Sequence, residues 1–152
     1  MNEPIEILLV EDNPNDVELT LRAFTRQKFA VRFQVARDGA EALDYLFGRG
    51  VHQGRDLSHQ PKLILLDLKL PKVDGMEVLR EIKSDPKTQL IPVVILTSSS
   101  IERDIRNGYD RGANSYIVKP VNYDQFMTMV SALGTYWLKF NKTMDGAAPG
   151  SA

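Results

Sequence analysis

Short apolar runs alternate along this chain with segments whose apolar residues recur at helical spacing, and this alternation limits the possible folds most strongly. Five runs have the character of strands, at 5–10, 31–35, 62–68, 92–97 and 115–119. The runs at 62–68 and 92–97 are apolar without alternation, as in strands buried on both faces. The pattern predicts an α/β fold, a flavodoxin-like doubly wound sheet of five parallel strands with five helices on its two faces.

Each strand-like run is followed by a helical pattern. Asp12, Asn13 and Pro14 supply capping side chains and a proline suited to a first helical turn. The segment 48–61 is polar and contains glycine, which predicts a long loop or a frayed helix extension. Its two histidines, His52 and His59, are expected to be plain surface residues.

Composition restricts the class of protein further. The chain has 152 residues, no cysteine, and 19 basic against 20 acidic residues, for a net charge of -1. It therefore has no disulfide scaffold, no thiolate zinc site and no basic field to hold nucleic acid or an anionic membrane. No targeting signal or membrane span is visible, so we expect a cytoplasmic protein. We expect one domain over 4–140, a short flexible tail over 141–152, and no output domain.

Reactive side chains stand at the ends of four of the five predicted strands. In a parallel sheet the carboxyl ends of the strands meet at one edge, and ligands bind there. The sequence therefore predicts that three carboxylates, a hydroxyl group and an ammonium group converge. They come from Glu11, Asp12, Asp67, Thr97 and Lys119.

This set of groups suits phosphoryl transfer. Three neighbouring carboxylates repel one another unless a cation neutralises them, and Lys119 and Mg²⁺ are the available candidates. No imidazole or thiolate stands among these groups to favour zinc. Asp67 can act as the nucleophile, because carboxylates form aspartyl-phosphates. The Thr97 hydroxyl can donate a hydrogen bond to a phosphate oxygen. Lys119 and the metal can offset the negative charge on the phosphate oxygens.

The ordered set resembles the receiver domain of two-component response regulators. Asp67 lies 55 positions after Asp12, Thr97 lies 30 after Asp67, and Lys119 lies 22 after Thr97. The stretch LDLKLPKVDGMEVL and a tyrosine three positions before Lys119 also match. The opening VEDNPNDVELT, the long loop before the third strand and the run TSSS are similar to single-domain receivers that partner bacterial phytochromes and related histidine kinases.

The resemblance implies a role for each residue of the acidic site. Asp67 would accept a phosphoryl group from the histidine of a sensor kinase. Asp12 and Asp67 would bind Mg²⁺ directly, Glu11 would bind it through water, and the backbone carbonyl of Lys69 would be a further ligand. No other cofactor is implied. The protein would be a signalling phosphoacceptor and not an enzyme with a separate substrate.

The resemblance also implies a conformational switch. Thr97 would move toward the phosphoryl group, Lys119 would pair with it, and Tyr116 would swing inward. This would re-form the face made by the fourth helix, fifth strand and fifth helix, which is a candidate surface for a partner or a homodimer. The Lys119–Pro120 peptide bond is expected to be cis, as is usual in the family. Aromatic residues near the C-terminus are either core or interface: Tyr123, Tyr136, Trp137 and Phe140.

Two positions depart from the commonest receiver residues. Lys69 stands two residues after Asp67, and Ser99 stands two residues after Thr97. In the family these positions tune how water reaches the acyl phosphate, so we predict slow or modified self-dephosphorylation.

Other functions and simpler local explanations remain open at this point. A pseudo-receiver would keep the fold as a binding module without taking phosphate. A haloacid-dehalogenase-like phosphatase needs a second aspartate as general acid-base where this chain has Lys69. A flavodoxin-like redox protein needs a phosphate-cradling loop where this chain has two acids. Locally, Glu11 and Asp12 could be first-turn helix acids, and Thr97 could be the N-cap of the fourth helix.

Overall fold

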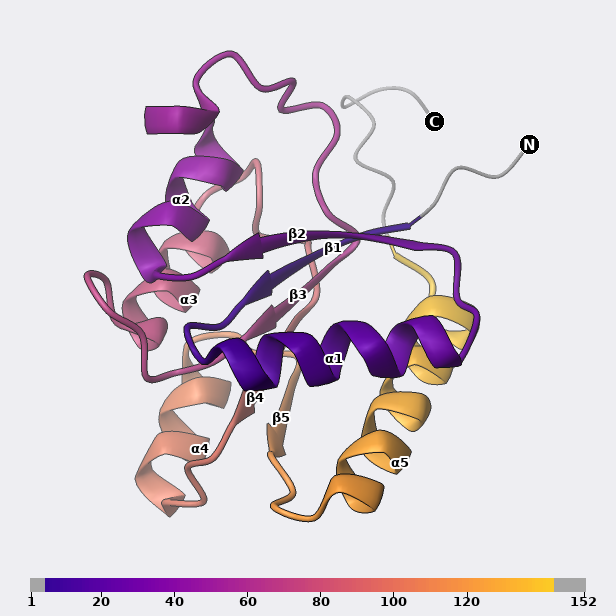
Figure 1. Ribbon diagram of the computed structural model, residues 1–152. Helices are drawn as coiled ribbons and strands as arrows, with labels where there is room; N and C mark the ends of the chain where they lie inside the picture. The colour runs from indigo at the N-terminus through magenta and orange to yellow at the C-terminus, as the bar shows by residue number, and fades with distance from the viewer. Residues whose placement is uncertain (1–4, 144–152) are drawn as a thin grey trace.

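Five parallel strands form one sheet with the order β2-β1-β3-β4-β5 in the computed structural model, which describes residues 5–143 (Figure 1). Each neighbouring pair is parallel. The strands are β1 (Ile5–Val10), β2 (Val31–Ala36), β3 (Leu63–Leu66), β4 (Val93–Thr97) and β5 (Ser115–Val118). The prediction of a flavodoxin-like doubly wound sheet is confirmed.

Five α-helices cover the two faces of the sheet, with α1 and α5 on one face and α2, α3 and α4 on the other (Figure 1). They are α1 (Pro14–Arg26), α2 (Gly39–Phe47), α3 (Gly75–Ser84), α4 (Glu102–Asp110) and α5 (Tyr123–Gly134). A π-helical segment, Thr135–Phe140, continues from α5. The expected tail begins at 141, and its part beyond residue 143 lies outside the described residues.

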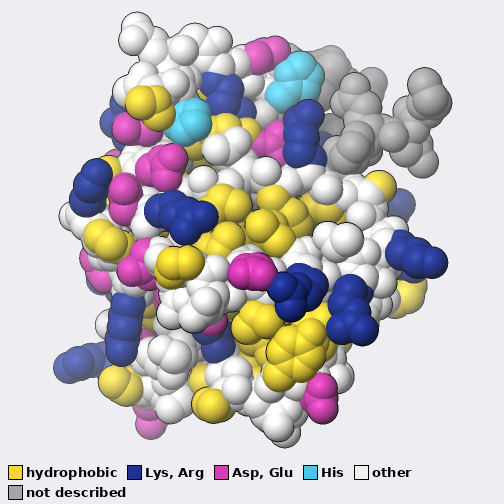
Figure 2. Space-filling model, viewed as in Figure 1, with side chains coloured by type: hydrophobic (Ala, Val, Ile, Leu, Met, Phe, Trp, Pro, Cys, Tyr) yellow, Lys and Arg dark blue, Asp and Glu magenta, His cyan; other side chains and the backbone are white. Residues whose placement is uncertain are grey.

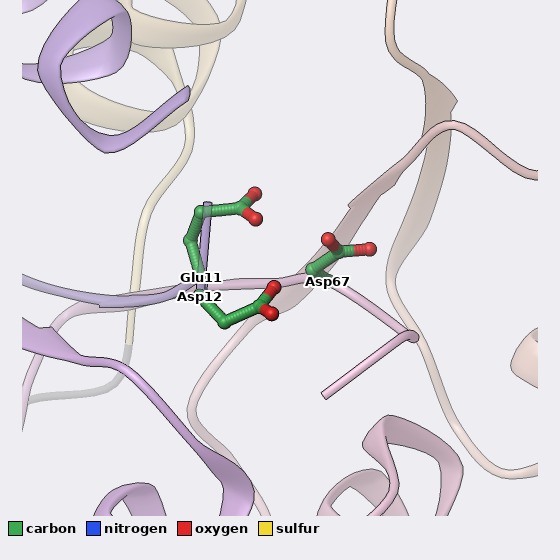
Figure 3. A group of neighbouring side chains, drawn as sticks. All are labelled: Glu11, Asp12 and Asp67. Atoms are coloured by element: carbon green, nitrogen blue, oxygen red, sulfur yellow. The ribbon is translucent and has the colours of Figure 1, made fainter. Parts of the chain in front are cut away.

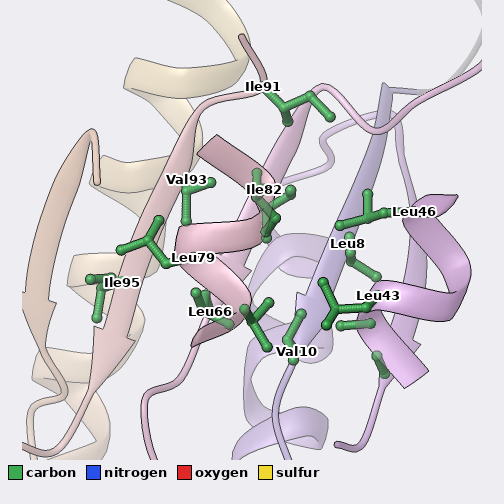
Figure 4. Packing of buried hydrophobic residues seen from close by; sticks show 14 of the residues in the cluster. Leu8, Val10, Leu43, Leu46, Leu66, Leu79, Ile82, Ile91, Val93 and Ile95 are labelled. Atoms are coloured by element: carbon green, nitrogen blue, oxygen red, sulfur yellow. The ribbon is translucent and has the colours of Figure 1, made fainter. Parts of the chain in front are cut away.

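Two hydrophobic cores lie on the two sides of the sheet because alternate side chains of each strand point to opposite faces. On one side, Leu8 and Val10 of β1 pack with the apolar faces of α2 and α3 (Figure 4). On the other side, Ile7 and Leu9 pack against α1 and α5. Every residue of β3 and β4 is buried, whereas the edge strand β2 is only half-buried. The apolar runs without alternation therefore mark the central strands, as predicted.

Helices α1, α2, α3 and α5 begin at polar caps, which set where each of these helices starts relative to the sheet edge. The side chains of Asn13, Asp38, Asp74 and Asn122 each accept hydrogen bonds from backbone N–H groups in the first turn of the next helix. Such caps each stabilise a helix by about 1 kcal/mol. None of the helices among residues 5–143 is long and apolar enough to cross a membrane. Figure 2 shows charged side chains spread between hydrophobic ones on the face that carries α1.

The segment 48–61 is a long loop, as the sequence predicted. It contains a short 3-10 helix, Gly50–His52, and is tied down by the guanidinium of Arg55. Arg55 donates to the backbone carbonyls of Tyr45 (2.6 Å) and His59 (2.9 Å), and lies 3.9 Å from the centre of the Tyr45 ring. His59 is exposed as expected, but His52 is half-buried against the Tyr45 ring. The prediction that both histidines are plain surface residues is therefore wrong for His52.

Candidate functional site

The sheet reverses its strand order at β1, because β2 lies on one side of this strand and β3 on the other. At such a switch point the following segments leave toward opposite faces and open a crevice at the carboxyl ends of the strands. Glu11 and Asp12 follow β1 directly, and Asp67 follows β3. The three predicted carboxylates therefore flank the place where such sheets bind ligands.

Backbone hydrogen bonds extend the ladder of the sheet one residue past the strands and so hold the site residues in register. The N–H of Asp67 donates to the carbonyl of Val10 at 3.0 Å. The N–H of Lys119 donates to the carbonyl of Thr97 at 2.7 Å. The main chain, and not only the side chains, thus fixes where the reactive groups stand.

The carboxylates of Glu11, Asp12 and Asp67 come together as predicted, with one oxygen from each lying within 4.8 Å of the others (Figure 3). Glu11 and Asp67 are buried, whereas Asp12 is exposed and leaves the group open to solvent. Carboxylate oxygens with an open side suit a hard divalent cation that keeps several waters. The residues present therefore fit a Mg²⁺-type ion.

Lys119 supplies the positive charge at this site. Its Nζ lies 2.5 Å from Glu11 Oε1, 2.9 Å from Asp16 Oδ2 and 3.3 Å from Asp67 Oδ2. An ammonium group has three N–H donors, so each donor has a carboxylate partner. The lysine links the end of β5 to the ends of β1 and β3 and to the first turn of α1.

Burial and charge act in opposite directions on the two closest groups. Burial and, to a smaller extent, the charge of Asp67 raise the pKa of Glu11 to about 7, against the lowering effect of its hydrogen bond to Lys119. Burial opposes the charge on Lys119, but its bonds to Glu11 and Asp16 and the charge of Asp67 raise its pKa above the ordinary value. The site is therefore an acidic cluster that contains the ammonium of Lys119 and a Glu11 carboxyl group with a raised pKa.

The backbone after Asp67 is packed closely against the start of α3. A Cβ atom at Gly75 would lie 2.5 Å from the Asp67 carbonyl oxygen and 2.6 Å from Leu68 Cα, so no larger residue fits there without a backbone shift. The N–H of Leu68 also donates to Asp67 Oδ1 at 2.7 Å. The glycine in the sequence pattern is thus explained by the close approach of α3 to this loop.

Thr97 is fully buried at the end of β4 and does not cap the next helix. Helix α4 begins at Glu102 with Ile101 at the cap position, so the alternative reading of Thr97 as an N-cap is wrong. The Thr97 hydroxyl instead accepts a hydrogen bond from the N–H of Ser99 at 3.4 Å. The Ser99 hydroxyl donates to Asp104 of α4 at 2.6 Å, which ties this loop to the helix.

Tyr116 connects β5 to the same loop. Its hydroxyl donates to the backbone carbonyl of Ser99 at 2.9 Å, and burial raises the pKa of this phenol. The ring packs against the core cluster on the α4 side, where a Cβ atom at Gly108 would lie 3.3 Å from the ring. Tyr116 therefore joins β5 to the loop between Thr97 and α4 through this hydrogen bond.

The expectation of a cis bond between Lys119 and Pro120 is wrong, because the bond is trans in the structure. A trans bond before proline is favoured by about 0.5–1 kcal/mol, and nothing in the residues themselves required the cis form. With this bond, Lys119 still reaches the three carboxylates. Lys69, two residues after Asp67, has an exposed side chain, and its backbone carbonyl remains a predicted metal ligand.

Asp16 is the one partner of Lys119 that the sequence pattern did not single out. It stands in the first turn of α1, six positions after the end of β1. An acid in the first turn of a helix is common, since it stabilises the positive end of the helix dipole. Only the position of that helix start beside the strand ends reveals that this acid also faces the site.

The sequence matches the model of the response regulator receiver domain over residues 7–131. Among its relatives, it is 44% identical over 141 residues to "Probable methanogenesis regulatory protein FilR2" of Methanothrix harundinacea, covering 93% of this chain and 88% of that protein. It is 39% identical over 138 residues to response regulator Rcp1 of Synechocystis, covering 91% and 92%.

Solved structures agree with these relationships. The phosphorylated cyanobacterial phytochrome response regulator RcpA superposes with a TM-score of 0.86 at 41% identity, covering 92% of this chain and 98% of that one. The Mn²⁺-bound form of Rcp1 gives a TM-score of 0.86 at 37% identity, covering 93% and 99%. A divalent metal at the acidic pocket is a property of the family and fits the cluster described above.

The family match covers most of the chain, the relatives align over nearly their whole length, and the expected carboxylates, hydroxyl and ammonium stand at the carboxyl edge of the sheet. This chain belongs to the response regulator receiver domain family, the signalling domains of two-component systems, and its homologues include phytochrome-associated response regulators.

Proposed function

We propose that this protein receives a phosphoryl group on Asp67 from a sensor histidine kinase in a Mg²⁺-dependent reaction and passes the signal on through a protein surface. An Asp67 carboxylate oxygen attacks the phosphorus of the kinase phosphohistidine. The new O–P bond forms as the N–P bond breaks, the electron pair of the N–P bond stays on the ring nitrogen, and the proton on the other ring nitrogen lets the imidazole leave as the neutral base. The convergence of Asp67 with Glu11, Asp12 and Lys119 is the observation that carries this proposal.

The residues around Asp67 have distinct proposed roles. Asp12 and Asp67 would hold the metal directly, Glu11 through water, and Lys69 through its backbone carbonyl. The metal would offset the charge that develops on the phosphoryl oxygens. Lys119 already lies 3.3 Å from Asp67 Oδ2, so its ammonium is placed to pair with the phosphoryl group.

The signal would leave the site through Thr97 and Tyr116. Phosphorylation replaces about one negative charge on Asp67 with about two and adds strong acceptor oxygens. We propose that the Thr97 hydroxyl turns from its contact with Ser99 toward these oxygens. The loop before α4 carries both Ser99 and the acceptor of the Tyr116 hydroxyl, so its shift would move the Tyr116 ring.

The face formed by α4, β5 and α5 is the proposed output surface. It exposes large apolar side chains that the core does not need: Ile101, Tyr109, Val118, Val121 and Tyr123. Exposed apolar groups of this kind are typical of protein contacts. We propose that this face binds a partner or a second copy of the chain, and that no nucleic acid is involved.

A phytochrome-like photoreceptor kinase is the proposed source of the phosphoryl group. RcpA is described as a cyanobacterial phytochrome response regulator and aligns with nearly the whole chain. The proposed receiver domain spans 4–140, and we propose that it acts as a relay or interaction switch. We place the protein in the cytoplasm with its kinase.

Two alternatives are less well supported. A pseudo-receiver would have lost part of the phosphoacceptor set, but this chain retains every member of it. A haloacid-dehalogenase-like phosphatase would need an aspartate at the position of Lys69, and this lysine cannot act as its general acid-base carboxyl group. We therefore propose that the protein is a phosphoacceptor and does not turn over a separate substrate.

Phosphorylation by a small phosphodonor tests the proposal. The full chain is incubated with acetyl phosphate and Mg²⁺, and phosphoprotein is measured by intact mass. We expect one phosphoryl group, sensitive to hydroxylamine as an acyl phosphate is, that requires Mg²⁺ and is absent from Asp67→Asn. Asp56→Asn, an exposed loop acid, is the matched control and should label normally. Equal labelling of Asp67→Asn would overturn the proposal.

Phosphotransfer profiling then identifies the donor. The labelled histidine kinases of the source organism are mixed one at a time with the chain, and transfer is followed over time. We expect the fastest transfer from a phytochrome-type kinase, and faster transfer from another class would reject that partner while leaving the phosphoacceptor role intact.

A further inference from the structure

The Asp16 side chain points toward the site and does not cap its own helix. The turn that begins α1 is capped by Asn13, whose side chain accepts from the N–H groups of Asn15 (2.9 Å) and Asp16 (3.2 Å). The Asp16 carboxylate is thus turned toward the strand ends, where Oδ2 lies 2.9 Å from Lys119 Nζ. Its side chain is 28% exposed, against 9% for Lys119, so it forms the outer wall of the contact.

The three carboxylates around Lys119 differ in what else they can do. Glu11 and Asp67 belong to the group of acids whose oxygens can share one cation, and Asp16 does not belong to it. Asp67 is also the proposed acceptor, and in the acyl phosphate the carboxyl oxygen that carries the phosphoryl group is a poor partner for an ammonium. Asp16 is therefore the carboxylate that can keep hold of Lys119 while the other two are engaged.

We propose that Asp16 is a positioning residue, which holds the Lys119 ammonium at the mouth of the site so that one of its N–H donors faces the incoming phosphoryl group. This inference rests on the proposed function and adds a residue to the receiver set. Lysine side chains are flexible, and an ammonium that Asp16 already holds in place loses less freedom when it binds the phosphoryl group. A charge-assisted hydrogen bond is a strong tether for this purpose.

The test compares two neutralising substitutions on the same helix in the full chain. Asp16→Asn keeps the shape of the side chain but removes its charge. Glu18→Gln is the matched control, because this exposed acid pairs with Arg22 at 2.5 Å, and side chains two positions apart on a helix do not share a face. Phosphorylation by acetyl phosphate with Mg²⁺ is measured over a range of donor concentrations. We expect the maximal rate of Asp16→Asn to fall about tenfold with little change in the half-saturating concentration, and Glu18→Gln to match the unsubstituted protein.

A second measurement reports on the ammonium itself in the unphosphorylated, metal-free protein. A buried, hydrogen-bonded lysine ammonium exchanges its protons slowly and can be detected by proton–nitrogen NMR. The Lys119 signal is identified by its loss in Lys119→Gln. We expect faster proton exchange in Asp16→Asn, no change in Glu18→Gln, and partial recovery of both signal and rate in Asp16→Glu.

The two measurements separate the outcomes. If Asp16→Asn is phosphorylated more slowly but the proton exchange of its Lys119 ammonium is unchanged, the effect comes from the lost charge at the helix terminus, and the proposal is overturned. A changed signal with an unchanged rate would make Asp16 a purely structural contact and overturn it as well. Failure of the unsubstituted protein to label would instead overturn the proposed function, and the ammonium signal would still show whether Asp16 holds Lys119.

Discussion

The Lys119 ammonium lies 2.5 Å from a carboxylate oxygen of Glu11, although the two residues are 108 positions apart in the chain. Both side chains are largely buried, with exposed fractions of 9% and 4%. A buried ion pair is a weak source of stability by itself, but removal of one partner leaves the other charge without compensation.

Lys119→Met should destabilise the metal-free protein strongly, because it leaves Glu11 and Asp67 buried beside each other without their cation. We expect a loss of about 3 kcal/mol in the free energy of unfolding at pH 8, measured by urea denaturation. Glu11→Gln added to Lys119→Met should restore part of the loss. Lys87→Met, on the exposed surface, should change stability by less than about 0.5 kcal/mol. Equal stability of the two single variants would contradict this prediction.

The stability of the metal-free protein should fall as the pH rises through the titration of Glu11. The pKa of this group is raised from 4.5 to about 7 in the folded state, mainly by burial. The folded state then binds its proton more tightly than the unfolded state does, so the stabilisation is complete below pH 4.5 and is lost as the pH rises through 7. Lys119, whose pKa is raised, stays charged throughout this range.

We expect Glu11 to contribute a loss of about 2–3 kcal/mol between pH 5 and pH 8. Denaturation curves at several pH values measure this loss in the free energy of unfolding. Glu11→Gln should remove the part of the pH dependence that comes from Glu11. Mg²⁺ should stabilise the protein more at pH 8 than at pH 5.5, because it binds deprotonated carboxylates. A slope that is the same in Glu11→Gln would show that another group titrates.

Gly75→Ala should disturb the acceptor loop. Its new methyl group would meet the Asp67 carbonyl oxygen and Leu68 Cα, which are backbone atoms that cannot rotate away. We expect a loss of about 2–3 kcal/mol in stability and a slower phosphorylation of Asp67. Gly54→Ala is the control, since a Cβ atom at Gly54 would have open space around it. The only expected cost is a loss of about 1 kcal/mol in stability from the left-handed backbone conformation (φ +88°). Similar losses for both variants would argue against the close packing of α3.

Arg55→Met should loosen the segment 48–61 without affecting the site. It removes the hydrogen bonds to the Tyr45 and His59 carbonyls and the contact with the Tyr45 ring. We expect faster amide hydrogen exchange throughout this segment, a loss of about 1–2 kcal/mol, and an unchanged phosphorylation rate. Arg49→Met, at an exposed arginine 3.8 Å from Asp44, should leave the exchange of the segment nearly unchanged. A slower phosphorylation in Arg55→Met would show that the segment is coupled to the site.

Lys69→Ala should change the lifetime of the phosphoryl group. Lys69 is exposed beside Asp67 and adds positive charge where water must approach the acyl phosphate. We expect a severalfold change in the rate of phosphoryl loss, measured by intact mass after removal of the donor. An unchanged lifetime in both Lys69→Ala and Ser99→Ala would contradict the idea that these positions tune self-dephosphorylation.

Most of the fold follows from local patterns, because the central strands are buried on both faces and reveal themselves as apolar runs. The acidic site is predictable for a related reason: residues that follow parallel strands meet at one edge whatever the loops do. Contacts between distant segments could not be predicted from the sequence in this way. The pairing of Asp16 with Lys119, and the burial of His52 against Tyr45, depend on how helices and loops pack, and no short-range pattern encodes them.

Main-chain hydrogen bonds join Asp67 to Val10 and Lys119 to Thr97. They fix the position of each reactive residue independently of which side chain it carries. A substituted side chain at either position begins from the same anchored Cα, since its backbone partner is unaffected. The backbone at the carboxyl edge of the sheet therefore keeps its position when the side chain at 67 or 119 is replaced. An Asp67→Glu or Lys119→Arg protein should present its altered group at nearly the same place, so the effect of reach and charge can be measured on one unchanged frame.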